Sequence, residues 1–210
     1  MIKNFYEKNI LPPLLNCCCG TKPITYQRKK IIPEANGDIL EIGVGSGLNI
    51  PFYDKNKVSK IIALDPSEDL NSMAKIKAKA NNLNIHFLTG VAEDIQIADS
   101  SIDTIVITYT LCTIPEPEKA LSEIKRVLRT NGKILFSEHG LAPDDKVVNW
   151  QNKINPIWNK VFGGCNLNRD IPSLFKAAGF ALTYEQMYLP STPKFVGFNS
   201  WGEAKISSHD

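Results

Sequence analysis

Three glycines stand at alternate positions after a short apolar run: Gly43, Gly45 and Gly47. Because glycine has no Cβ atom, it lets the backbone turn tightly and approach a ligand closely. Asp65 stands 18 residues beyond Gly47, at the end of the next apolar run. A carboxylate in that position can accept hydrogen bonds from both hydroxyls of a ribose. The loop and the acid together predict a cofactor that contains adenosine, with a helical segment opening directly after the loop.

The spacing of the glycines and the charge beside them discriminate between adenosine cofactors. A dinucleotide fingerprint needs its third glycine at position 48, where this chain has Leu48. Glu41 would repel a pyrophosphate, whereas it suits a ligand that carries an ammonium and a sulfonium. A phosphate loop for ATP needs a Gly-Lys-Ser/Thr sequence, which the chain lacks. The pattern therefore favours S-adenosylmethionine over NAD and ATP.

Residues at the ends of two later apolar runs complete the predicted cofactor site. Ala92 and Glu93 follow the third run, where a backbone amide and a carboxylate could bind the adenine edge. Asp94 is the second candidate for this carboxylate, and the alternative interpretation of both acids is an exposed loop position. Thr108 ends the fourth run, on the edge of the sheet where ligands of open α/β folds bind.

The chemistry of this cofactor sets what else the chain must supply. Methyl transfer from a sulfonium is a single in-line displacement, so the enzyme mainly holds two reactants in line and excludes water. A thiol is already partly ionised near neutral pH, whereas a hydroxyl or an ammonium must lose a proton. His139, after the fifth run, is the candidate catalytic base because imidazole titrates near neutral pH. A hydrogen-bonded structural role is the alternative for this histidine.

Four side chains in the second half of the chain are candidates for the acceptor site. Cys112 and Cys165 could lie near the acceptor, although buried packing is the alternative for both thiols. Trp150 could line an apolar pocket or pack on the sheet. Arg169 could bind an anionic acceptor or form an ion pair with Asp170 or Glu138. Together these residues favour a small, partly apolar acceptor over a polymer.

Secondary-structure elements must position these residues. Apolar runs alternate with helical patterns along the chain, which is typical of βαβ units and a parallel sheet. Near-continuous apolar runs indicate strands that helices cover on both faces. A helix is predicted through residues 118–129, with Asn131-Gly132 as a left-handed stop before the next strand. The predicted strands are residues 39–42, 60–64, 84–88, 104–108, 133–137, 181–188 and 195–201.

The length of 210 residues favours one α/β domain. We expect an N-terminal helical cap over residues 1–36 and a cofactor-binding domain over residues 37–210. Prolines, tryptophans and glycines break the alternation over about 141–170, which predicts an insertion on the substrate side. The apolar face of the N-terminal segment could pack on the domain or rest on a membrane surface.

Composition excludes several classes of protein. A formal net charge of +2 with no basic stripe gives no reason to expect nucleic acid, and we interpret the run Arg28-Lys29-Lys30 as a solvated helix face. Five cysteines, three of them adjacent at Cys17, Cys18 and Cys19, predict reduced thiols in a cytoplasmic protein rather than a disulfide framework. The spacing of cysteines and histidines predicts no metal site. The first residues lack the features of a signal peptide and no run of eighteen apolar residues occurs, so we expect neither a signal peptide nor a membrane-spanning segment.

Several of these segments resemble one large family. Residues 40–47, 64–67, 92–94 and 126–132 are similar to the class I S-adenosylmethionine-dependent methyltransferases. Residues 110–115, 137–140, 150–151 and 163–169 resemble a narrower group, which contains bacterial proteins labelled phospholipid methyltransferases and animal enzymes that methylate alkyl thiols. The animal members carry an N-terminal membrane anchor, and this chain departs from them because it lacks an apolar segment of that length.

The resemblance implies a Rossmann-like sheet of seven strands with an antiparallel last strand. It also implies that the glycines lie along the methionine part of the cofactor, Asp65 at the ribose and Ala92 and Glu93 at the adenine. The expected reaction is methyl transfer to a thiol, a lipid headgroup or a quinone-like precursor. A non-catalytic sensor or partner subunit that binds the same cofactor is the alternative, and a nicotinamide-dependent oxidoreductase is disfavoured by Leu48 and Glu41. The oligomeric state stays open.

Overall fold

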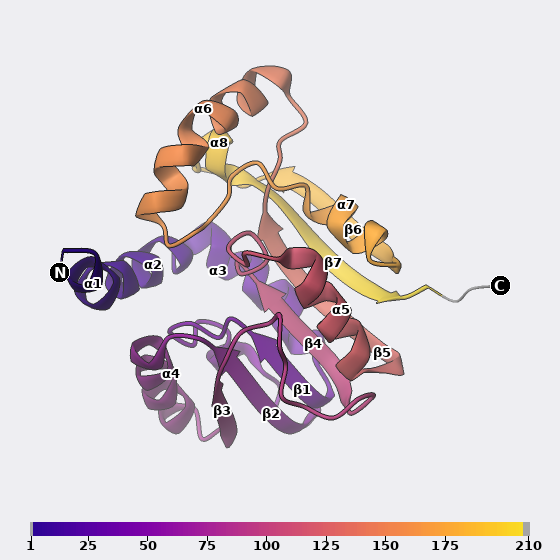
Figure 1. Ribbon diagram of the computed structural model, residues 1–210. Helices are drawn as coiled ribbons and strands as arrows, with labels where there is room; N and C mark the ends of the chain where they lie inside the picture. Colours follow the sequence, from indigo (N-terminus) through magenta and orange to yellow (C-terminus); the bar gives the residue numbers. More distant parts are fainter. Residues whose placement is uncertain (1, 208–210) are drawn as a thin grey trace.

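A computed structural model describes the backbone of residues 2–207 and the side chains from Phe5 to Ser207. Residue 1 and residues 208–210, which fall at the ends of the two predicted segments, lie outside the described residues. The chain folds around one mixed sheet with helices on both faces (Figure 1). The predicted α/β fold class is therefore confirmed.

Within residues 2–207, seven strands form the sheet in the order β3-β2-β1-β4-β5-β7-β6. The first five strands in this order run parallel to one another, and β7 runs antiparallel to both β5 and β6. The antiparallel last strand that the resemblance implied is thus present. The strands are β1 (Gly37–Ile42), β2 (Val58–Asp65), β3 (Ile85–Thr89), β4 (Ile102–Thr108), β5 (Leu128–His139), β6 (Phe180–Tyr188) and β7 (Phe198–Ile206).

Two apolar cores cover the two faces of the sheet. On one face, α5 (Pro117–Val127) and α7 (Ile171–Ala177) pack over alternate side chains of the central strands. On the other face, α3 (Lys22–Ile31), η1 (Ile32–Glu34) and α4 (Glu68–Ala80) pack over the intervening side chains. Because successive side chains of a strand point to opposite faces, strands buried on both faces become continuously apolar.

Two additions stand at the carboxyl ends of the parallel strands. The N-terminal segment forms α1 (Ile2–Asn9) and α2 (Leu11–Cys19) before α3 joins the core. The segment after β5 forms α6 (Asp145–Val161), which packs against the short α8 (Lys194–Gly197). Figure 1 shows α1 and α2 beside the end of α6, on the same side of the sheet edge.

The connections differ from the sequence expectation in two places. The glycine loop leads into a single 3-10 turn, η2 (Ile50–Phe52), rather than into a longer helix. The side chain of Ile50 is fully buried beside Ala74 of α4, so α4 covers the area where a helix was expected. The predicted stop at Asn131-Gly132 is also wrong, because α5 ends at Val127 and the chain enters β5 directly.

Candidate functional site

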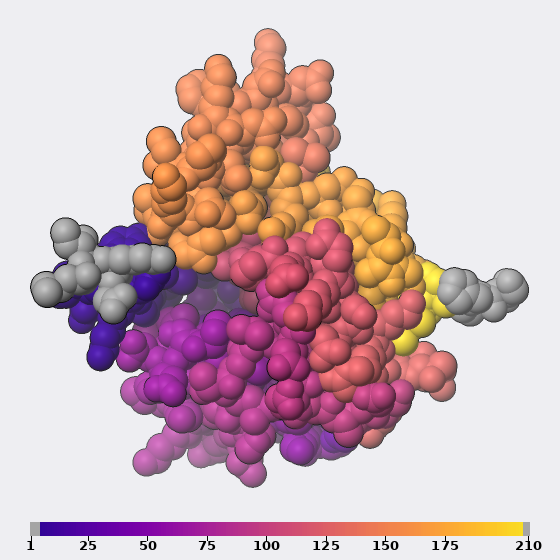
Figure 2. Space-filling model, viewed as in Figure 1, coloured from indigo at the N-terminus to yellow at the C-terminus, as the bar shows by residue number. Residues whose placement is uncertain are grey.

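A cavity of about 320 Å³ opens at the carboxyl ends of β1, β2 and β4. Its volume is within the range of small-molecule sites. The space-filling view shows the surface hollowed between the N-terminal helices, the first half of the sheet and the end of α6 (Figure 2). Six of the predicted cofactor residues line this cavity, namely Gly43, Gly45, Asp65, Ala92, Glu93 and Thr108.

The glycine loop is held in conformations that favour glycine. Gly43, Gly45 and Gly47 all have positive φ angles, of 69°, 53° and 76°. A Cβ atom on Gly43 would collide with the side chain of Thr110. Gly47 does not line the cavity, because its α-carbon faces Ala74 of α4. The loop thus passes close to the turn after β4 on one side and to α4 on the other.

Asp65 connects the end of β2 to the glycine loop. Its Oδ2 atom accepts a hydrogen bond from the Gly45 backbone N–H at 2.8 Å, and Oδ1 accepts one from the Ser67 N–H at 2.9 Å. Burial raises the pKa of this carboxyl despite the two backbone bonds. Each carboxylate oxygen can accept a second bond, so this side chain can bind a hydroxyl-bearing ligand in the cavity.

Glu41 lies under the loop and does not line the cavity. Its carboxylate is only 1% exposed and accepts hydrogen bonds from Tyr53 Oη at 2.7 Å and Asn49 Nδ2 at 2.9 Å. Burial raises its pKa from 4.5 to about 7, although both hydrogen bonds oppose that shift. The structure therefore puts Glu41 in a buried polar network next to the cofactor residues, and not among the lining residues.

Arg28 lines the cavity, and the sequence analysis missed it. Its side chain is 4% exposed, and Nη1 donates to Asn49 Oδ1 at 2.7 Å and Thr108 Oγ1 at 2.5 Å. The guanidinium lies 5.1 Å from the centre of the Tyr109 ring, and Nε is buried without a hydrogen-bond partner. Among the described residues, no carboxylate lies within ion-pair distance of it. This buried cation can therefore bind an anionic group of a ligand.

The interpretation of the basic run as a solvated face holds for Lys29 and Lys30 but not for Arg28. The three residues are neighbours on one short helix, and α3 buries one side of itself against the sheet. Arg28 is buried because it lies on the side of α3 that packs against the sheet, and tertiary contacts decide which side that is. The only local signal was the apolar spacing of Ile24, Ile31 and Ile32 around it.

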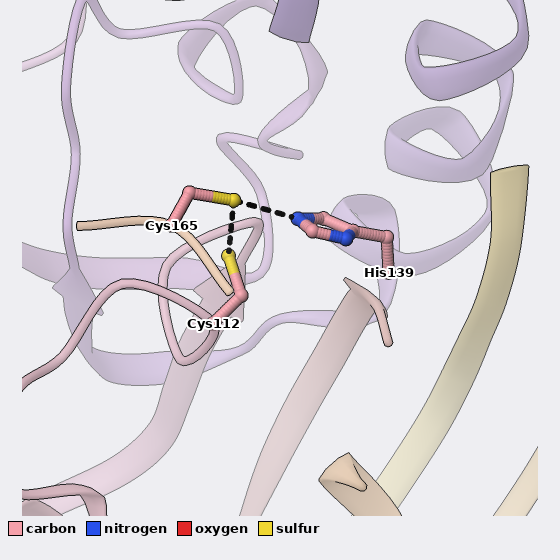
Figure 3. A group of neighbouring side chains, drawn as sticks. All are labelled: Cys112, His139 and Cys165. Atoms are coloured by element: carbon pink, nitrogen blue, oxygen red, sulfur yellow. Dashed lines mark hydrogen bonds between the residues drawn. The ribbon is translucent and has the colours of Figure 1, made fainter. Parts of the chain in front are cut away.

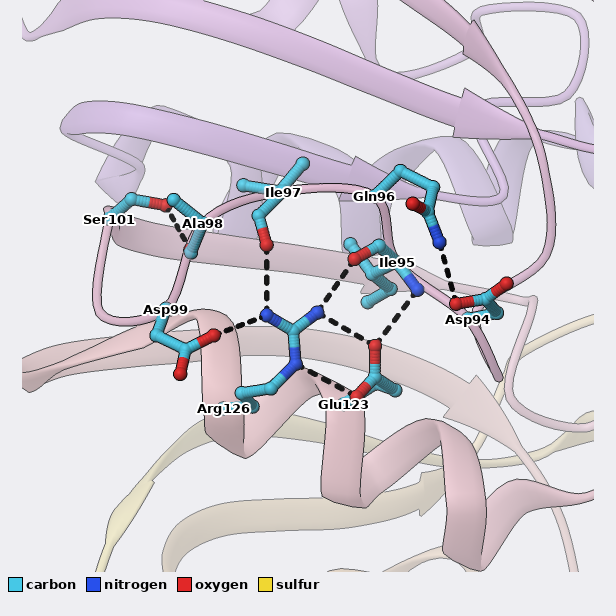
Figure 4. Close-up of polar contacts among 9 residues, drawn as sticks. All are labelled: Asp94, Ile95, Gln96, Ile97, Ala98, Asp99, Ser101, Glu123 and Arg126. Atoms are coloured by element: carbon cyan, nitrogen blue, oxygen red, sulfur yellow. Dashed lines mark hydrogen bonds and ion pairs between the residues drawn. The ribbon is translucent and has the colours of Figure 1, made fainter.

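The loop that carries Ala92 and Glu93 is fixed by a polar network just beyond it. Arg126 of α5 donates to the carbonyl oxygens of Ile95 at 2.6 Å and Ile97 at 2.9 Å (Figure 4). Glu123 pairs with the same guanidinium and accepts from the Ile95 N–H at 3.0 Å. The network fixes this loop to α5. The backbone next to Ala92 and Glu93, the predicted adenine-binding residues, is therefore held in place.

His139, Cys112 and Cys165 lie together, but outside the cavity lining. Cys165 Sγ is 3.2 Å from His139 Nε2 and 3.8 Å from Cys112 Sγ (Figure 3). All three side chains are buried. The neighbouring residues Thr113 and Ile114 line the cavity, so the cluster lies directly behind its wall. The structure therefore brings three separately predicted residues into one cluster.

The remaining predicted acceptor residues also lie away from the cavity lining. Trp150 is 62% exposed on α6. Arg169 donates through Nη1 to the carbonyl oxygens of Leu111 at 2.5 Å and Ile114 at 2.8 Å, so it fixes the turn after β4. Neither of the acids suggested as its partner forms an ion pair with it among the described residues.

Apolar side chains from distant parts of the chain form the opposite wall of the cavity. Leu11 and Leu15 come from α2, and Phe162 follows α6. The two segments touch, because Tyr6 Oη donates to the Val161 carbonyl oxygen at 2.5 Å. The N-terminal helices and the insertion therefore enclose one apolar end of the cavity.

Comparisons with known proteins agree with this site. A model of the family described as "Methyltransferase domain" matches residues 40–136. Thiol S-methyltransferase TMT1A of Homo sapiens is 31% identical over 82% of this chain and 72% of its own length. Thiol S-methyltransferase TMT1B of Homo sapiens is 34% identical over 69% of this chain, and the chain spans only 61% of that protein.

A solved structure carries the same fold. The crystal structure of a SAM-dependent methyltransferase from Aquifex aeolicus superposes with a TM-score of 0.64 at 20% identity. The superposition covers 93% of this chain and 98% of that one. The overall fold of this chain is therefore one that is known from experiment.

Proposed function

Because this chain belongs to the class I S-adenosylmethionine-dependent methyltransferases, we propose that the acceptor of its methyl group is a small, partly apolar thiol. Methyl transfer from S-adenosylmethionine is the activity of the family. The identity of the acceptor is our inference, because it rests on the cavity and on relatives that are longer than this chain.

The residues of the cavity fit the cofactor. Gly43 and Gly45 line the cavity without side chains, so the cofactor can approach the backbone of the loop closely. Asp65 offers carboxylate oxygens for the ribose, and Arg28 offers a buried guanidinium for the carboxylate of the methionine part. Charge-assisted hydrogen bonds of this kind are the strong ones. Ala92 and Glu93 would bind the adenine end.

The bound cofactor supplies an activated methyl group on a sulfonium. The chain's own residues hold the two reactants in line and exclude water, which is the main requirement of a displacement of this kind. Thr108 and Arg28 form one side of the cavity, linked at 2.5 Å. Leu11, Leu15 and Phe162 form the apolar side, where we expect the acceptor to enter.

The single observation that carries the thiol proposal is the set of ionisable groups in the cavity wall. Within the described residues, neither histidine nor lysine lines it. Asp65 is bound by two backbone N–H groups, and Glu93 Oε1 accepts from the Glu116 N–H at 3.3 Å. Burial raises the pKa of Tyr109, and it raises the pKa of Cys19 to about 11. A thiol is already partly ionised near neutral pH, so it is an acceptor that needs no base in the cavity wall. A role for His139 as a base stays a prediction that this proposal does not need.

The proposal is tested by following the labelled methyl group. We would incubate the protein with methyl-labelled S-adenosylmethionine and a panel of alkyl thiols, matched alcohols, phosphatidylethanolamine vesicles and demethylated quinols. We expect the label on sulfur of the thiols and none on the alcohols. Label that appears only on the lipid headgroup or the quinol would refute the thiol proposal and favour the other acceptors that the resemblance implied.

We also propose that the end of the molecule around the apolar wall contacts a membrane surface peripherally, in a cytoplasmic protein. Exposed apolar side chains gather there, namely Phe5, Ile10, Ile157 and Val161. Over the described residues, no helix is long and apolar enough to cross a membrane. Burial of exposed apolar side chains at the lipid headgroups would bring lipophilic acceptors to the cavity.

Vesicle co-sedimentation tests this contact. We expect the double substitution Phe5→Ser with Ile157→Ser to reduce the vesicle-bound fraction relative to the unmodified protein. Ile76→Ser is the control, because Ile76 is at least as exposed as the two substituted residues and lies away from them on α4. Absence of binding by the unmodified protein, or an equal loss in the control, would contradict the proposal.

A further inference from the structure

The buried cluster of Cys112, His139 and Cys165 has the dimensions of a metal-ligand set. Its three ligand atoms lie within 4.8 Å of one another. Zinc–sulfur bonds of about 2.3 Å at tetrahedral angles separate two sulfur ligands by about 3.8 Å. The Sγ atoms of Cys112 and Cys165 are 3.8 Å apart. The two sulfurs therefore already stand at the separation that a shared tetrahedral ion requires (Figure 3).

Hydrogen bonds within the protein leave this cluster incompletely satisfied. His139 Nδ1 is buried without a hydrogen-bond partner, and Nε2 of the same ring lies 3.2 Å from Cys165 Sγ. The indole Nε1 of Trp158 donates to the same sulfur at 3.3 Å. An indole N–H is only a donor, so it favours an electron-rich sulfur such as a metal-bound thiolate.

The backbone around the ligands is fixed in advance. Asn166, next to Cys165, donates from both its N–H and Nδ2 to the Cys112 carbonyl oxygen. Arg169 holds the carbonyl oxygens on both sides of Cys112. Glu138, beside His139, accepts from the Cys112 N–H at 3.3 Å. The three segments that carry the ligand atoms are therefore already held in position, and they need not rearrange to bind an ion.

Charge selects the kind of ion. The residues that bind would be two thiolates and one neutral imidazole, and a divalent cation between them gives a site with no net charge. Such a site suits a position as buried as this one, because an uncompensated charge is costly there. Two thiolates and an imidazole are a zinc-type donor set, with a fourth coordination position open.

We propose that Cys112, His139 and Cys165 bind a zinc ion. Binding replaces the proton of each thiol with a bond to the ion, so one Zn²⁺ and two thiols give one zinc dithiolate and two protons. The ion would join the turn after β4 to the loop after α6, and thereby fix the wall that Thr113, Ile114 and Phe162 contribute to the cavity.

Metal analysis of the full chain tests the proposal. The protein is purified under reducing conditions without chelators, and its metal content is measured by mass spectrometry. We expect about one zinc per chain, and a loss of at least about tenfold in Cys112→Ser and Cys165→Ser. Cys17→Ser is the matched control, because Cys17 is exposed on α2, and it should retain the metal.

A second measurement applies if the serine variants do not fold. Cobalt added to the reduced, metal-stripped unmodified protein should give sulfur-to-cobalt charge-transfer bands and the strong visible bands of a tetrahedral site. Zinc should then displace the cobalt. An unmodified protein that holds no stoichiometric metal and gives no such cobalt spectrum would overturn the proposal, as would recovery of a Cys112–Cys165 disulfide under the same reducing conditions.

Discussion

The carboxylate of Asp65 accepts a hydrogen bond from the backbone N–H of Gly45 at 2.8 Å, across 20 residues of sequence. This contact joins the two features that a sulfonium cofactor needs at this edge of the sheet: an acid for the ribose and a glycine loop for the methionine part. The Asp65 side chain both fixes the loop and lines the cavity. Its removal should therefore weaken the binding of the cofactor.

Asp65→Ala should weaken the binding of S-adenosylhomocysteine by about 10- to 100-fold, because charge-assisted hydrogen bonds contribute about 1.5–3 kcal/mol. Isothermal titration calorimetry measures the change. Asp69→Ala is the control, since Asp69 is an exposed acid in the first turn of α4. Unchanged affinity in Asp65→Ala would show that the ribose assignment is wrong.

Arg28→Gln should reduce affinity only for ligands that carry the amino acid part of the cofactor. We expect a loss of about 10- to 100-fold for S-adenosylhomocysteine, from a lost bond between charged groups, and little change for methylthioadenosine, which has no carboxylate. Lys29→Gln changes the neighbouring exposed cation and should change neither affinity. Equal losses for both ligands in Arg28→Gln would mean that the arginine acts on the fold and not on the carboxylate.

The sequence alone predicted each of the seven strands and six residues that line the cavity, because both depend on local patterns: apolar runs and the residues that end them. The last strand was expected at residues 195–201 but lies at Phe198–Ile206, since Lys194–Gly197 forms α8. Arg28 could not be predicted in the same way, since it reaches the cavity from a helix that precedes the sheet. The zinc-type cluster was missed for a related reason. Its ligands are 27 and 26 residues apart, and only the topology brings the ends of β4 and β5 to the loop after α6.

The stop expected at Asn131-Gly132 shows how tertiary packing overrides turn chemistry. Those residues lie inside β5, where a Cβ atom on Gly132 would come within 2.6 Å of a Leu128 side-chain carbon and 3.0 Å of the Asp103 carbonyl oxygen. Glycine is thus needed there for close approach between strands rather than for a left-handed turn. A sequence pattern cannot separate these two uses of glycine.

Glu41 should make stability depend on pH. Its pKa is raised from 4.5 to about 7 in the folded protein, so the folded state keeps a proton that the unfolded state loses between those values. The free energy of unfolding should therefore fall as pH rises through that window, by up to about 3 kcal/mol, and then level off. Thermal or urea unfolding of the unmodified protein and Glu41→Gln at pH 4.5 to 8 measures the difference.

In that experiment the stability advantage of the unmodified protein over Glu41→Gln should shrink with rising pH. Glu34→Gln serves as the control because Glu34 is exposed, and it should follow the unmodified protein throughout. A difference between the unmodified protein and Glu41→Gln that stays constant across the range would contradict the assigned pKa.

The pH dependence of methyl transfer should follow the acceptor and not the enzyme. Since no histidine or lysine lines the cavity in the described part of the chain, the thiol must ionise unaided. Profiles of kcat/KM for two thiols of different pKa should therefore have midpoints that shift with the thiol. A common midpoint near 6 to 7 for both thiols, abolished in His139→Gln, would instead identify His139 as the base.

The most direct test of thiol methylation compares one acceptor with its oxygen analogue. Methyl-labelled S-adenosylmethionine is supplied with an alkyl thiol or the matching alcohol, and kcat/KM is measured for each with the unmodified protein and with Asp65→Ala. We predict a labelled thioether from the thiol, at a rate that Asp65→Ala strongly reduces, and no labelled ether from the alcohol. Equal transfer to both acceptors, or transfer to neither while the cofactor binds, would contradict the account.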